Sequence, residues 1–186
     1  MRTQCHNPTQ ARNLQGGFSL IELLIVVAII LIIAAIAIPN LLRAKIAANQ
    51  ASAVQTLRTM TSAEQTFSST YSDGFTLTLA QLGGPPGSST CTNAGLVDEL
   101  LSVPPARKEG YAFVLTPNGN PALTAGVPAA CGGPGDTGYT ISATPTTQGI
   151  TGTASYCVDE TGVIRVNEAG VAVPPPCSGS GFPPLQ

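Results

Sequence analysis

Tryptophan is absent from this sequence, and charged, aromatic and histidine residues are scarce. Of the 186 residues, 10% are charged, 5% are aromatic, and His6 is the only histidine. No run of lysine or arginine occurs, and basic residues do not alternate with aromatic ones. Because nucleic-acid phosphates require clustered basic side chains, this composition argues against general nucleic-acid binding.

The scarcity of histidine also limits the possible catalytic sites. His6 lies in an N-terminal segment that we expect to be removed, which leaves no imidazole for Ser-His-Asp or Cys-His catalysis or for a histidine metal site. Asp98 and Glu99 are adjacent, as are Asp159 and Glu160, and adjacent side chains point apart on a helix or a strand. We therefore predict that the protein is not an enzyme.

The main positive feature is a long apolar run near the N-terminus. Leu23 to Ile38 contains 16 consecutive apolar residues, and Glu22 is the only charged residue between Leu20 and Ile38. The 21 residues from Phe18 to Ile38 correspond to about 31 Å of helix, close to the roughly 30 Å hydrocarbon core of a bilayer. This length and composition predict a membrane-spanning helix rather than a helix buried in a soluble core.

Two ordinary explanations of this run are open. Arg2 and Arg12 could form the basic start of a secretory signal with a cleavage site at Ala35–Ala37, which would release a soluble domain that begins at Ile38. This explanation fits less well, because the apolar run is longer than usual and Glu22 interrupts its start. Alternatively, the run could be a permanent anchor for an exported binding domain that never polymerises.

The residues around Gly17 support a third explanation. Residues 16–40, GGFSLIELLIVVAIILIIAAIAIPN, resemble the N-terminus of type IV prepilins and type II secretion pseudopilins. The matching features are a short basic leader, Gly17 before the cleavage site, Phe18 as the new N-terminus, Glu22, and an apolar stretch that ends in Pro39. The resemblance is specific over this segment and fades in the helical sequence that follows.

This resemblance implies a precursor that becomes a structural filament subunit. Prepilin peptidase would cut after Gly17 and methylate the amine of Phe18. Inner-membrane pilus or secretion machinery would then move the subunit from the lipid bilayer into a homopolymer or a mixed pilin filament. The leader would stay cytoplasmic, the helix would cross the inner membrane once, and the C-terminal domain would lie outside, later in an extracellular or periplasmic filament. The sequence leaves open whether this filament is a type IV pilus or a secretion pseudopilus.

Glu22 has two explanations, which are compatible. The spacing of Ser19 and Glu22 fits a capping box at the start of a helix, and a carboxylate in the first turn favours the positive helix end. The resemblance implies a second role, in which Glu22 neutralises the cationic amine of Phe18 on its own chain or on a neighbour. We favour this pairing role, because an ionisable group at membrane depth is a functional candidate with a partner to be named.

The pattern beyond Pro39 predicts an α+β fold of the pilin type. Apolar residues recur mostly at three- or four-residue intervals up to Tyr71, which predicts an amphipathic helix that ends near the turn at 72–74. Pro39 should kink the long helix without ending it. Four short strands are expected, at 110–115, 138–144, 155–159 and 162–166. They should form a small antiparallel sheet that packs on this half of the helix.

The cysteines indicate an oxidising compartment. Cys5 would leave with the leader, and the four others are Cys91, Cys131, Cys157 and Cys177. An even number in a loop-rich exported domain implies two disulfides, for which three pairings are possible. We predict Cys91–Cys131, which clamps the Pro/Gly-rich middle of the domain, and Cys157–Cys177, which ties the unpatterned tail to the last hairpin. No Cys or His spacing suggests zinc.

This interpretation requires no cofactor, and calcium is a secondary alternative. Major pseudopilins, which the N-terminus resembles, carry a structural calcium in a C-terminal loop. Candidate oxygen ligands in this chain are Asp159, Glu160 and Glu168. The loop of those proteins does not map onto this sequence, so calcium does not enter the main prediction.

These expectations divide the chain into four parts. Residues 1–17 form a cleaved cytoplasmic leader, and residues 18–39 form the transmembrane and filament-core helix. Residues 40–72 continue as the amphipathic helix into the globular domain. Residues 73–186 form a disulfide-containing β-sheet domain with Gly/Pro-rich loops.

Overall fold

The fold is described from a computed structural model, which covers residues 17–71, 74–85, 87, 90–121, 131, 134–177 and 181–185. The expectations for the leader before Gly17 and for the turn residues 72–73 lie outside these residues. The chain divides into two compact units, Met1–Asn40 and Leu41–Gln186, and each is described by itself.

One long helix, α1 (Leu20–Tyr71), contributes residues to both units. It begins at Leu20 rather than at Phe18, and it continues through Pro39 as helix. A proline removes one backbone hydrogen bond, and the bonds on either side hold the helix together across the gap. A kink at Pro39 stays a prediction. The helix ends at Tyr71, next to the expected turn, and Gly74 beyond it has a φ of 86°, which glycine adopts without strain.

The part of α1 in the second unit buries a single stripe of side chains. These residues recur every three or four positions, which is the spacing of one helix face. They are Ala53, Thr56, Leu57, Met60, Ala63, Glu64 and Phe67. The amphipathic helix predicted for 40–72 therefore packs its expected apolar face, with one unexpected acidic residue in it.

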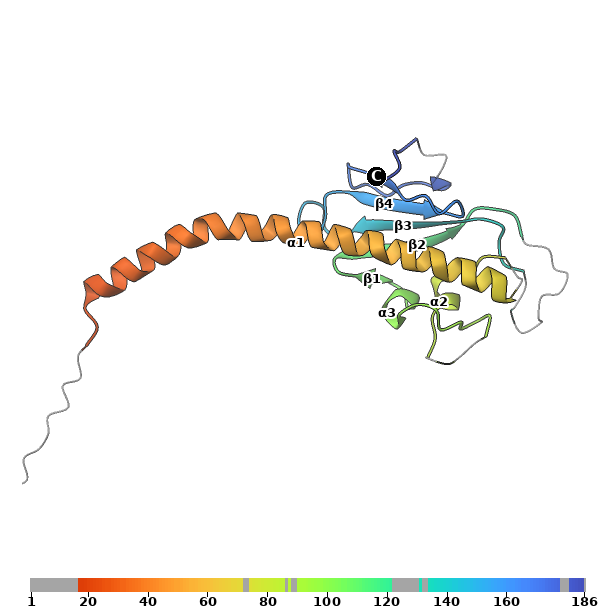
Figure 1. Ribbon diagram of the computed structural model, residues 1–186, viewed down its shortest axis with the longest axis horizontal. Coiled ribbons are helices and arrows are strands. Elements are labelled where there is room, and N and C mark those ends of the chain that lie inside the picture. Colours follow the sequence, from red (N-terminus) through yellow and green to blue (C-terminus); the bar gives the residue numbers. More distant parts are fainter. Residues whose placement is uncertain are drawn as a thin grey trace, which may run out of the picture. The chain divides into compact units, whose positions relative to one another are not determined.

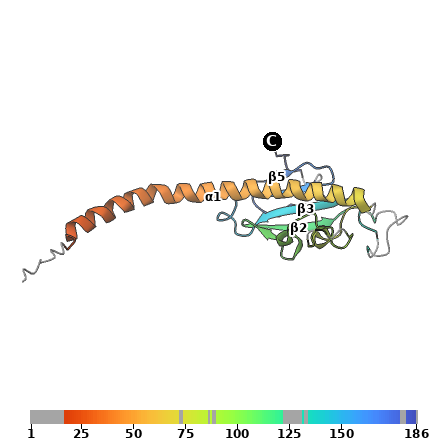
Figure 2. The ribbon, with the colours of Figure 1, turned by 60° about the horizontal axis from the view of Figure 1, so that its bottom comes forward.

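This part of α1 lies along one face of a five-stranded sheet, as Figures 1 and 2 show. The strands are β1 (Arg107–Lys108), β2 (Tyr111–Pro117), β3 (Tyr139–Pro145), β4 (Ser155–Asp159) and β5 (Arg165–Asn167). Every neighbouring pair is antiparallel, and the spatial order is the chain order. Tyr111, Tyr139 and Ile141 are fully buried in the core between the sheet and α1. The predicted α+β architecture is confirmed.

The strand predictions need two corrections. The last strand, expected at 162–166, begins only at Arg165. The Asp159 carboxylate accepts hydrogen bonds from the N–H and hydroxyl of Thr161, and Gly162 has a φ of 75°, so this stretch is a turn. The second correction is strand β1, which was not predicted. It forms a hairpin with β2 through Glu109 and Gly110, at φ 44° and 79°.

Two short helices precede the sheet, and the described part of the tail follows it. Helices α2 (Leu79–Leu82) and α3 (Glu99–Ser102) lie between α1 and β1 in the chain. In the tail, Val173 and Cys177 pack with Cys157 of β4 in a small second core. This core buries Cys157, while Tyr156 and Val158 of β4 are buried in the main core. All five residues of β4 are buried, whereas β2 alternates between buried and more exposed residues near its start.

Candidate processing and assembly site

The expected cleavage site lies in a short non-helical stretch directly before α1. Gly17, Phe18 and Ser19 have no regular secondary structure, and all three are exposed. A Cβ atom added at Gly17 would meet nothing within 4 Å, and Gly17 is not among the glycines with positive φ. The fold of the uncut chain therefore gives no reason for glycine at this position.

Glu22 makes a local hydrogen bond in the uncut chain. The backbone N–H of Ser19 donates to the Oε2 atom of Glu22 at 2.9 Å, and this bond is exposed. It is one half of the expected capping box. The described residues show no reciprocal bond from the Glu22 backbone to the Ser19 hydroxyl. The Glu22 carboxylate thus caps the N-terminal end of the helix by bonding to the main chain of Ser19, and not to the Ser19 side chain.

The apolar helix that follows exposes its side chains all round. Its most apolar window has a mean hydropathy of 3.3, and none of that window is buried. Leu20 is 81% exposed and Ile36 is 67% exposed. In the described part of the chain, α1 is the one helix long and apolar enough to cross a membrane. Exposing this much apolar surface to water is unfavourable, so the segment requires lipid or other apolar helices around it.

The four cysteines of the globular unit form two disulfides in the structure. Cys91 is bonded to Cys131, and Cys157 is bonded to Cys177. This is the pairing expected from the sequence. The second bond joins the central part of the sheet to the tail, because Cys157 lies in β4 and pairs in register with Ser142 and Arg165. Peptide mapping of the protein remains the test of both bonds.

The structure does not gather the candidate calcium ligands into a metal site. Asp159 is buried and accepts bonds from Thr161, whereas Glu160 and Glu168 are exposed. Among the described residues, no group of three or more His, Cys, Asp or Glu side chains could hold a metal ion.

A buried carboxylate was missed by the sequence analysis. Glu64 of α1 is 0% exposed, and its two oxygens accept hydrogen bonds from the N–H and the hydroxyl of Thr76 at 3.0 and 2.5 Å. Burial raises the pKa of Glu64 to about 7, against a smaller lowering by the two Thr76 bonds. Its spacing from Met60 and Phe67 on one helix face was the available signal.

Comparison with known families bears on the N-terminal segment. Residues 12–38 match the family model described as the prokaryotic N-terminal methylation motif. No curated protein and no solved structure gives a match. The matched residues include Gly17, Phe18 and Glu22, and they extend through the exposed apolar part of α1.

These observations define a class of protein. The methylation motif, the long apolar N-terminal helix and the small antiparallel sheet match the signature of type IV prepilin-like proteins. The motif supports a precursor of the pilin or pseudopilin kind, anchored in a membrane by its apolar helix. Proteins with this motif are structural rather than enzymatic.

Proposed function

We propose that this chain is a prepilin-like precursor that is cut between Gly17 and Phe18, methylated on Phe18 and polymerised through the apolar part of α1. The product is a structural subunit of a type IV pilus or of a type II secretion pseudopilus. Gly17 and Phe18 are the processing residues, and Glu22 and Pro39 belong to the assembly segment. Two disulfides hold the globular domain together outside the membrane.

The observation that carries this proposal is the position of the matched motif. It covers an exposed, non-helical Gly17–Phe18 bond and the exposed apolar helix that follows. A peptidase needs an accessible, extended bond, and the fold itself does not require glycine at position 17. Both facts fit a residue that serves a processing enzyme rather than the folded chain.

The proposal assigns each part of the chain to a compartment. Residues 1–17 are the cytoplasmic leader, 18–39 cross the inner membrane and later form the filament core, and 40–72 continue as helix into the domain. Residues 73–186 complete the domain outside the membrane. The partners are the prepilin peptidase and methyltransferase, the inner-membrane assembly machinery, lipid before assembly, and other pilin subunits in an extracellular or periplasmic filament.

The direct test is the N-terminus of the protein purified from its own cells. Mass spectrometry of the N-terminal peptide should find a chain that begins at Phe18 and carries one extra methyl group. A chain that begins at Met1 would instead be an uncut anchor, and one that begins at Ile38 would be a secreted soluble domain. Either result would overturn the proposal.

The choice between pilus and pseudopilus needs a genetic experiment. Deleting the gene and complementing it with the wild-type chain separates the two filaments by phenotype. Loss of surface pili supports a pilus subunit, whereas loss of protein secretion with pili intact supports a pseudopilus subunit. Neither loss, together with correct processing at Phe18, would argue against both roles.

A further inference from the structure

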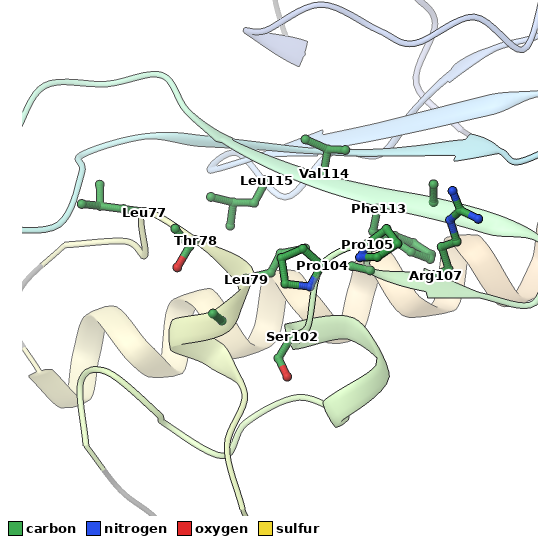
Figure 3. A pocket seen from close by; sticks show the side chains of 13 residues that line it. Leu77, Thr78, Leu79, Ser102, Pro104, Pro105, Arg107, Phe113, Val114 and Leu115 are labelled. Carbon is green, nitrogen blue, oxygen red and sulfur yellow. The ribbon is translucent and has the colours of Figure 1, made fainter.

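A groove on the globular unit lies beside strand β2, where the short strand β1 leaves part of its edge unpaired. It has a volume of about 420 Å³ and a mostly apolar lining. Figure 3 shows side chains from β2, from the segment at 77–79 and from the Pro104–Pro105 turn gathered around it. Leu77, Pro104 and Val114 at its margin are exposed. None of the processing or assembly residues takes part in it.

The backbone of β2 offers hydrogen-bonding groups to this groove. The N–H of Phe113 donates to the carbonyl of Ala106 at 2.9 Å, so odd-numbered residues of β2 direct their backbone groups away from β3. Leu115 is the next residue of this kind. On the edge of β2 that faces away from β3, the residues of β1 that pair with β2 are Arg107 and Lys108. Within the described chain, no backbone group continues this ladder opposite Leu115.

Prolines explain why the ladder stops there. Continuing the register of β1 and β2 places Pro104 opposite Leu115, and Pro104 has no N–H to donate. Beyond Ala106 no backbone hydrogen bond to this edge of β2 is seen in the described chain, so β2 keeps the backbone groups of Leu115 unpaired next to an apolar surface. An open strand edge is a template for a further extended strand.

The positive charge of Arg107 distinguishes one end of the groove from the other. Arg107, the first residue of β1, lines this end of the groove and is exposed. Asp98 and Glu99 line an adjoining hollow together with Arg107, but no carboxylate oxygen of the described residues lies within ion-pair distance of it. A strand that continues the line of β1, antiparallel to β2, would end beside Ala106 and Arg107. Its terminal carboxylate would then meet the guanidinium.

We propose that this groove binds the C-terminal end of an extended apolar peptide from another protein, added to β2 as an antiparallel strand with its carboxylate at Arg107. The five described strands of this chain are already paired within its own sheet, so none of them is free to be donated by a second copy. This inference does not rest on the proposed filament function.

The test uses the full chain in lipid nanodiscs and a defined probe. The probe is a fluorescein-labelled peptide of alternating threonine and valine with a free C-terminal carboxylate, and binding is followed by fluorescence anisotropy. The same peptide with N-methylated valines cannot complete the ladder and should bind at least about tenfold more weakly. The peptide with a C-terminal amide should lose about threefold, as expected for one exposed charge pair.

Matched variants connect binding to the groove. Leu77→Glu places a charge on the apolar wall and should weaken binding at least about tenfold. Val171→Glu changes an exposed valine outside the groove and should leave binding unchanged. Arg107→Gln should reduce affinity to that of the amide peptide and abolish the difference between the two peptides, whereas Lys108→Gln should not. Each variant is first checked for native disulfides and near-ultraviolet circular dichroism.

Hydrogen exchange locates the contact. Bound peptide should slow exchange of the Leu115 amide and leave the amides of β4 unchanged. Several results would overturn the proposal: no binding of the peptide, equal binding of the N-methylated peptide, or insensitivity to Leu77→Glu. Binding of decanoate with the same Leu77 and Arg107 dependence, but no binding of peptide, would mark a lipid site instead. Groove-dependent self-association of the chain would point to a second copy and would equally contradict it.

Discussion

The two parts of α1 place a carboxylate in opposite surroundings. Glu22 lies in a helix segment whose large apolar side chains are exposed, and its bond to Ser19 is exposed. Glu64 lies in a buried stripe, is itself fully buried, and is satisfied by Thr76 twelve residues along the chain. The second part of α1 therefore has its packing and hydrogen-bonding partners within this chain, whereas the first part requires partners from outside it.

The same contrast holds for the apolar side chains. Leu57, Met60 and Phe67 are fully buried by the sheet, but Leu20 and Ile36 remain more than half exposed. The globular unit can therefore be tested through its stability, and the first part of α1 only through processing and assembly. The four predictions that follow use this division, from the largest expected effect to the smallest.

The largest effect is expected for Glu22→Ala. In a filament core the cationic amine of processed Phe18 and the Glu22 carboxylate are both removed from water, and deleting one partner of a buried pair costs about 3–5 kcal/mol. In the membrane the monomer can hold both groups at the interface, where water solvates them. The variant should therefore insert, fold and be cut normally but lose nearly all filament formation. Sheared filament yield relative to membrane subunit level measures this.

Two further variants separate charge pairing from helix capping. Glu22→Gln keeps an acceptor for the Ser19 N–H but removes the charge, so the pairing role predicts that it also fails to assemble. Ser19→Ala keeps the main-chain donor seen in the structure and should assemble normally, with at most about 1 kcal/mol lost from the helix. Normal filaments from Glu22→Gln would falsify the pairing role and leave capping as the explanation.

The next effect concerns the disulfides of the globular unit. Cys91–Cys131 and Cys157–Cys177 close loops with sequence separations of 40 and 20. Restricting the unfolded chain in this way contributes about 3–4 kcal/mol each, slightly more for the longer loop. Replacing either pair with serines should lower the free energy of unfolding by this amount. Denaturant unfolding of the full chain in nanodiscs measures the loss, with the double variant Ser62→Ala/Ser69→Ala as an exposed-surface control.

The two disulfides should also differ in their local consequences. Loss of Cys157–Cys177 should release the tail from β4, because among the described residues the small second core there adds just Val173 and Phe182 to the two cysteines. Limited proteolysis should then cut the tail first. Non-reducing peptide mapping of the wild-type chain must find both pairs, and crossed pairs or free thiols would contradict the prediction.

Sequence patterns predicted the parts of this fold that depend on local periodicity. The long helix, its buried stripe and β4 follow from apolar spacing, and the N-terminal motif follows from residues that act near one another in the chain. Strand β1 could not be predicted, since it has two residues and its turn, Glu109-Gly110, is not a strong hairpin signal. The groove beside β2 depends on where 77–79 and 104–107 come together, which no local pattern encodes.

Glu64 shows a different limit of structure prediction from sequence patterns. Its position on the helix face indicated burial, but an acidic residue in a helix is ordinarily solvated, and its partner Thr76 lies beyond the end of α1. Only the fold brings Thr76 back to the helix. Tyr139, also fully buried, packs edge-on against Phe75 in the same region, with ring centroids 4.8 Å apart.

The third prediction is a pH dependence caused by Glu64. Burial raises its pKa from 4.5 to about 7. Between these values the unfolded chain has lost the proton and the folded chain retains it, so stability falls as pH rises through this window and levels off above it. The difference corresponds to about 3 kcal/mol. Tyr139 nearby does not titrate in this range, because burial raises its pKa to about 12.

Glu64→Gln removes this dependence while keeping hydrogen-bonding capacity toward Thr76. The variant should match the wild type near pH 4.5 and be more stable than it at pH 8, by an amount approaching the same 3 kcal/mol or so. Thermal unfolding in nanodiscs at a series of pH values measures the profile. Glu168→Gln changes an exposed carboxylate and should keep the wild-type slope. A Glu64→Gln profile as steep as the wild type would show that other groups cause the dependence.

The smallest effect compares Gly17 with Gly162, one glycine from each region. A Cβ atom at either position would meet nothing within 4 Å, but only Gly162 has a positive φ, of 75°. Gly162→Ala should therefore cost about 1 kcal/mol of stability through backbone strain alone, with processing unchanged. Gly17→Ala should leave the unfolding curve unchanged and slow the appearance of the mature N-terminus. Unfolding curves and a pulse-chase of precursor and mature chain distinguish the two residues. If Gly17→Ala matured at the wild-type rate, the glycine there would serve neither the fold nor the peptidase.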